Sequence, residues 1–213
     1  MSNQRLIRLA AAALIVAAVS LTLGRILHPT NDLAGWTSPL WGPSHVLWLV
    51  GLVSGMIGVV GLYLRQRQEV RLLGFVGAGL AWIGMALLSG AMYFEAVIWP
   101  DLLVQTPAAI ESLGNLSGYG TYLAVFLVSV ASFGVGFLIF GIAMLRARLL
   151  PRWAIILVII GAVIGGPQGF LPPLVATLSF VALGVGLVGL GFWLWGAASD
   201  PYPATGDQAV GVL

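Results

Sequence analysis

The chain has 213 residues, of which 60% are hydrophobic and 8% are charged, and its formal net charge is +2. With a mean hydropathy of +1.04 it has too little polar surface to cover a soluble globule, so the composition predicts an integral membrane protein. Cysteine and lysine are both absent, which excludes disulfides, thiolate metal sites and a protein-bound Schiff base.

Six apolar runs follow one another along the chain, each long enough to cross about 30 Å of hydrocarbon, which takes roughly 20 helical residues. None has the alternating polarity of a barrel strand. We therefore predict an all-α polytopic membrane bundle of six transmembrane helices, built as one domain over residues 1–196. The remaining tail, 197–213, is expected to be polar, cytoplasmic and flexible. The predicted spans are residues 6–27, 44–64, 72–98, 121–145, 153–171 and 174–195.

The first run resembles a secretory signal in one respect, because Arg5 and Arg8 precede it. Its apolar length of about 20 residues exceeds the usual 7 to 15 of a signal, and no small-residue cleavage site follows it. We expect it to be retained as the first membrane span.

Two heptapeptides between apolar runs share the same arginine pattern. Residues 65–71 (RQRQEVR) and 146–152 (RARLLPR) both carry arginine at their first, third and seventh positions. Arginine gathers in cytoplasmic loops, so both loops and both termini are predicted to lie in the cytoplasm of a bacterium, with the chain in its inner membrane.

The same comparison suggests an internal duplication. Laying spans two and three on spans four and five also aligns small residues, and the paired helices run in the same directions. This predicts two equivalent hairpins related by an axis along the membrane normal. The alternative is that any cytoplasmic loop collects arginine and any glycine-rich helices align easily. The aligned pairs include Gly55 with Gly136, Ala81 with Ala162, and Gly84 with Gly165.

Glycines at spacings of four mark helix-packing seams. Gly51 and Gly55 form one pair, and Gly161 and Gly165 form another. Small residues let helix backbones approach closely where lipid provides no hydrophobic drive for association. We expect tight helix contacts at both seams.

Polar residues collect at the end of the bundle opposite the arginine loops. Glu95 continues a stripe of small residues on the third span, so we expect it to face the bundle interior. Arg25 ends the first span and either reaches the outer headgroups or pairs with a carboxylate. His45 begins the second span, and Gln168 lies in a Gly-Pro break at the outer end of the fifth. These four, Glu95, Arg25, His45 and Gln168, are the candidate ligand-binding residues.

A metal site is the weaker hypothesis at the same end. His28, His45 and Glu95 are residue types that bind divalent metals, and two histidines could also hold haem b, but their spacing matches no known motif. We therefore predict no cofactor.

Catalytic motifs are missing as well: the chain has no HExxH, no paired glutamates and no defensible Ser-His-Asp order. We therefore expect no catalytic residues and favour a noncatalytic protein over an enzyme. The leading functional hypothesis is binding or passage of a small molecule or ion through an extracytoplasmic vestibule. The alternative is a noncatalytic structural or assembly subunit that packs through its glycine-rich faces. Expected partners are the lipid bilayer and either other membrane subunits or further copies of the chain, with no nucleic acid.

Overall fold

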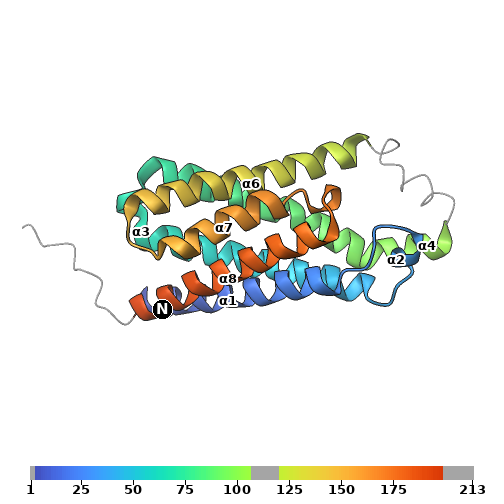
Figure 1. Ribbon diagram of the computed structural model, residues 1–213, viewed down its shortest axis with the longest axis horizontal. Coiled ribbons are helices and arrows are strands. Elements are labelled where there is room, and N and C mark those ends of the chain that lie inside the picture. Colours follow the sequence, from blue (N-terminus) through green and yellow to red (C-terminus); the bar gives the residue numbers. More distant parts are fainter. Residues whose placement is uncertain (1–2, 107–119, 199–213) are drawn as a thin grey trace, which may run out of the picture.

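The computed structural model describes residues 3–106 and 120–198, and every regular element in these ranges is helical. The long helices lie side by side in one bundle (Figure 1). In chain order the elements are α1 (Asn3–Leu27), α2 (Leu33–Trp36), α3 (Trp41–Tyr93), a π-helical turn (Phe94–Ile98), α4 (Trp99–Gln105), α6 (Gly120–Ala147), α7 (Arg152–Gly165), a 3-10 turn (Gln168–Phe170) and α8 (Pro173–Ala197).

Helix α3 is a hairpin. Its 53 residues would extend about 80 Å if straight. Gln66 and Arg71 leave the helical conformation, and the indole nitrogen of Trp41 at the start of α3 donates to the carbonyl of Glu95 just beyond its end, at 3.0 Å. Residues 41–65 and 72–93 therefore form two antiparallel rods, which coincide closely with the second and third predicted spans.

Six helical rods, namely α1, the two arms of α3, α6, α7 and α8, form a closed ring. Helix α1 packs against both α3 and α8, α3 packs against α6, and α7 packs between α6 and α8. Figure 1 shows α8 lying between α1 and α7 on the near face. Successive rods run antiparallel: Gly51 faces Leu21 while Gly58 faces Leu14, so one helix descends as the other rises.

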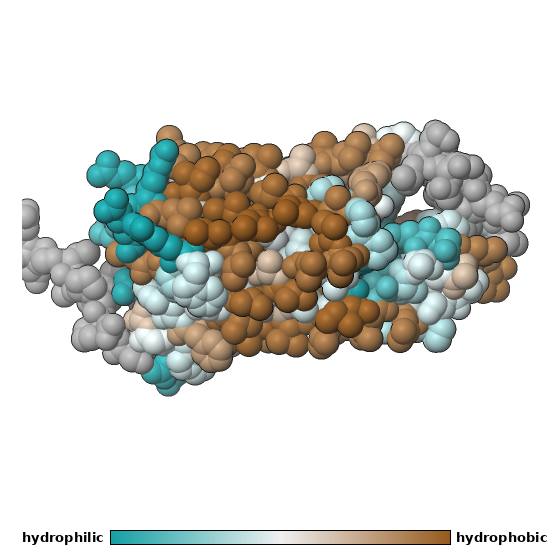
Figure 2. Space-filling model, viewed as in Figure 1, coloured by the Kyte–Doolittle hydropathy of each residue, from teal (hydrophilic) through white to brown (hydrophobic). Residues whose placement is uncertain are grey.

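Among the described residues, four helices are long and apolar enough to cross a membrane, with mean hydropathies of 2.1 to 2.5: Gln4–Leu27, Trp41–Gln105, Gly120–Ala147 and Pro173–Ala197. Figure 2 shows an apolar belt around the middle of the visible face, with hydrophilic residues gathered at the ends. These features fit a membrane protein. The six-span count stays a prediction, because α3 counts once in this set and α7 has only 14 residues.

The fifth predicted span differs from the expected run of residues 153–171. Helix α7 ends at Gly165, and a 3-10 turn then covers Gln168–Phe170. Pro167 has no N–H to continue the helical ladder and its ring disfavours the preceding turn, so the apolar run breaks where the sequence places Gly166-Pro167. The polar tail falls almost wholly outside the described residues.

The arginine loops lie together at one end of the bundle, which we call the arginine end. Arg71 adopts a φ of 48° and Arg148 a φ of 59°. These are the seventh position of the first heptapeptide and the third position of the second, so the two loops turn at different places. The duplication therefore remains a prediction from sequence alone.

The predicted glycine seams are contacts within the bundle. A Cβ at Gly51 would lie 2.7 Å from the Leu21 side chain, and one at Gly161 would lie 2.6 Å from the carbonyl of Ser179. Gly77, Gly84 and Gly136 bring α3 and α6 together backbone against backbone. The core between the rods includes fully buried side chains, among them Leu14, Leu62, Met85, Phe140 and Met144.

Candidate functional site

The opposite end of the bundle, which we call the histidine end, carries a buried imidazole. His45 is 0% exposed and lies in the second turn of α3. Its Nδ1 is 2.7 Å from the carbonyl oxygen of Trp41, one turn earlier. A carbonyl can only accept, so Nδ1 carries the proton and donates it. This bond fixes the ring, and Nε2 points toward Glu95.

The imidazole of His45 and the carboxyl group of Glu95 are in direct contact. Nε2 of His45 lies 2.6 Å from Oε2 of Glu95. This contact joins the start of α3 to the π-helical turn that follows it, as the bond from the Trp41 indole to the Glu95 carbonyl does.

Pro100 explains the backbone conformation around Glu95. The N–H of Trp99 bonds the carbonyl of Phe94, five residues back, and Pro100 has no N–H at all. The carbonyl of Glu95 therefore has no helical donor and accepts from the indole of Trp41 instead. This π-helical turn, a feature often found at functional sites, sets the direction of the Glu95 side chain.

Tyr122 completes the carboxylate's contacts. Its hydroxyl, at the start of α6, donates to Oε1 of Glu95 at 2.8 Å. Glu95 is thus held from three sides by groups on α3 and α6 and is 20% exposed. Nothing in the sequence spacing points from Tyr122 to Glu95, because the two residues lie on either side of the segment 107–119.

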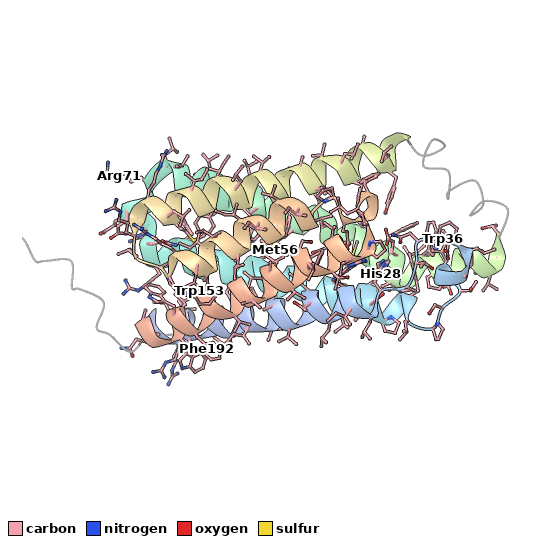
Figure 3. All side chains as sticks on the ribbon, in the orientation of Figure 1. His28, Trp36, Met56, Arg71, Trp153 and Phe192 are labelled. Atoms are coloured by element: carbon pink, nitrogen blue, oxygen red, sulfur yellow. The ribbon has the colours of Figure 1, made fainter. Side chains whose placement is uncertain are left out.

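His28 lies beside this cluster and is neutral at neutral pH. Its ring stacks on Trp48 with centroids 4.7 Å apart and lies 5.0 Å from the ring of His45. Burial first, and the neighbouring His45 second, lower the pKa of His28 to about 4. Figure 3 places His28 at the far end of the bundle from Arg71.

A small cavity opens one helical turn deeper than the cluster. Its volume is about 50 Å³, room for one or two water-sized groups, and all six rods contribute to its wall. Trp48 connects the two regions, since it lines the cavity and also contacts both histidines. Three more aromatic rings line the cavity: Phe126, Phe133 and Phe180.

The remaining sequence candidates are divided between the cavity and its surroundings. Gln168 lines the cavity, and its Oε1 is buried without a hydrogen-bond partner. Arg25 does not join Glu95: its guanidinium donates to the carbonyl of Pro173 at 3.3 Å. Asp32, a carboxylate at the same end of the bundle, caps α2 by accepting from the N–H of Gly35 at 2.9 Å, a bond that lowers the pKa of Asp32.

The three suggested metal ligands lie near one another, but both nitrogens of His45 are already engaged by Trp41 and Glu95. Within residues 3–106 and 120–198, no three His, Cys, Asp or Glu side chains converge as a metal site.

Comparison with known proteins gives no assignment. No protein family, no curated protein and no solved structure shows a significant match to the chain. The helices support a membrane protein, and any more specific function rests on the site itself.

Proposed function

We propose that the chain crosses the membrane six times, with the arginine end and both termini in the cytoplasm. The hairpin of α3 supports two crossings by one helical element, because its ends meet at Trp41 and Glu95. The short α7 packs between α6 and α8 and continues into the 3-10 turn, which extends its reach. The arginine loops at one end match the positive-inside rule.

Single cysteines test this topology cleanly, because the native chain has none. Asn31 lies in the exposed connection at the histidine end and Gln68 in the exposed turn of α3 at the arginine end. In intact cells we expect a membrane-impermeant maleimide to label Asn31→Cys and to leave Gln68→Cys unlabelled until the cells are permeabilised. Equal labelling of both before permeabilisation would contradict the proposed orientation.

We further propose that the histidine end binds a small cation, with Glu95 as its charge partner. The observation that supports this proposal is the composition of the cavity wall. Trp48 and three phenylalanine rings line the cavity, and the π faces of aromatic rings attract cations. The unpartnered Oε1 of Gln168 is an acceptor in the cavity wall, so a cation or a hydrogen-bond donor would satisfy it. The carboxyl group of Glu95, already in contact with His45 and Tyr122, adds an acidic group one helical turn above.

Binding is better supported than passage. The cavity holds about 50 Å³, and beneath it the described interior is filled by fully buried side chains such as Met85 and Phe140. A carrier or channel would need a polar path continuing toward the arginine end. The closed core favours a site that receives its ligand from one side of the membrane.

The alternative function, a structural subunit that packs through glycine faces, has less support. Those faces are occupied by the chain's own helices: Gly55 packs on Met85, and Gly165 packs on Ser179 and Phe180. A partner subunit would have to use other surfaces.

Thermal unfolding of the purified protein tests the ligand class. Methylammonium chloride should raise Tm above the value in equal sodium chloride, by an amount that grows with concentration as a bound ligand requires. Glu95→Gln keeps the side-chain shape and should abolish the rise. Glu69→Gln, which changes an exposed carboxylate at the arginine end, is the matched control and should retain it. An equal rise in wild type and Glu95→Gln would remove the support for Glu95 as charge partner.

A further inference from the structure

A second, larger concavity lies on the outside of the bundle over α8. It has a volume of about 590 Å³ and almost wholly apolar walls. Small residues of α8, including Gly184 and Gly189, form its floor. Val19 and Leu23 of α1 border one side, and Trp153 of α7 borders the other. Figure 3 shows Trp153 and Phe192 toward the arginine end of this face.

The groove has the length of one lipid tail. Its lining on α8 runs from Val181 to Phe192, eleven helical steps, which correspond to about 16 Å. Half of a hydrocarbon core of about 30 Å is about 15 Å. An acyl chain of a single leaflet therefore matches the length of the groove.

The side chain of Arg8 lies at the arginine end of the groove. Val181, Val185, Val188 and Phe192 follow one another at steps of four and three on α8, and the next position of this stripe is Trp195. The guanidinium carbon of Arg8, on α1, lies 6.0 Å from the centre of the Trp195 ring. Arg8 is exposed, so its charge remains available to a headgroup beyond the groove.

The charged side chains described at this end are nearly all positive. Arg5 lies one turn before Arg8 and is also exposed, and the first turn of α1 contains no acidic residue. Among the described residues the arginine end holds a single carboxylate, Glu69, on the turn of α3. An anionic headgroup thus meets arginine, whereas a zwitterionic headgroup brings its own cation to the same place.

We propose that this groove is a binding site for one anionic phospholipid of the leaflet at the arginine end. One acyl chain lies along the small-residue face of α8, between Leu23 and Trp153. The phosphate lies at Arg8, which Trp195 orients through its ring. This site is separate from the proposed cation site, since the two lie toward opposite ends of the molecule.

Native mass spectrometry of the purified protein tests the proposal with phosphatidylglycerol and phosphatidylcholine as probes. Wild type should retain one phosphatidylglycerol in preference to phosphatidylcholine. Arg8→Gln should lower the retained phosphatidylglycerol about tenfold, as expected from the loss of one charge-assisted contact, and leave phosphatidylcholine unchanged. Val185→Phe puts a ring into the groove at an exposed position and should lower retention of both lipids.

Two controls distinguish a site from general attraction. Arg67→Gln removes an exposed arginine from the same end but from the turn of α3, and should retain phosphatidylglycerol as wild type does. Equal losses in Arg8→Gln and Arg67→Gln would overturn the site in favour of diffuse charge. A dimer mass that Val185→Phe abolishes would overturn it in favour of a second copy of the chain as occupant.

Discussion

Gly136→Val should destabilise the protein more than any other single substitution considered for this bundle. A Cβ at Gly136 would overlap the backbone nitrogen of Ala81, and backbone cannot rotate aside as a side chain can. Overpacking in a close-packed interior typically costs about 1–3 kcal/mol, and we expect the upper end or beyond because two helices must separate. Reversible unfolding in mixed micelles would measure the loss.

Gly79→Val is the matched control. Gly79 lies on α3, two residues before Ala81, and no atom lies within 4 Å of where its Cβ would be. Valine has a slightly better helix propensity than glycine, so the change should lie within about 0.5 kcal/mol of neutral. Equal losses at both positions would mean that glycine acts through the backbone rather than through contact between α3 and α6.

The contrast between these glycines also shows what the sequence could predict of the fold. Apolar run length predicts where long helices lie, and small-residue spacing predicts that some of their faces pack tightly. Neither says which helix meets which face. Gly136 pairs with Ala81 because the rods form a ring in chain order, and that order follows from short loops and shape rather than from any residue pattern.

Local backbone features were predicted unevenly. The break after α7 follows from Pro167. The sequence indicated a Gly-Pro break there, but the predicted fifth span ran on to residue 171, whereas α7 ends at Gly165. Helix α2 was missed, because its four residues have too little length to leave a period and depend on the cap from Asp32. The π-helical turn was missed too. Pro100 signals a missing donor, but only the nearby indole of Trp41 makes the wider turn favourable.

The candidate site was predicted in outline. A carboxylate on a small-residue stripe pointed into the bundle, as Glu95 does, and His45 shared its depth. Their contact could not be predicted, because it requires the start and end of α3 to meet. The sequence also grouped Arg25 with Glu95, whereas the structure gives Arg25 the carbonyl at the start of α8. Position along the axis of the bundle could be predicted from the sequence, while position around the ring of helices could not.

Glu95→Leu should cost roughly 3 kcal/mol of folding free energy, the lower end of the range for breaking a buried ion pair, because Glu95 is 20% exposed. The substitution leaves Nε2 of fully buried His45 without its partner and removes the acceptor of Tyr122. Glu95→Gln should cost much less, since an amide can donate to Nε2 and accept from the tyrosine.

A double-mutant cycle with His45→Leu separates the pair from its surroundings. If the cost of Glu95→Leu is the orphaned imidazole, His45→Leu combined with Glu95→Leu should recover part of the stability lost in either single variant. Strict additivity would instead mean that the two side chains act independently. Recovery of stability by two leucines would also show that the fold does not require the polar pair. Binding at the neighbouring aromatic cavity would then account for the presence of the pair.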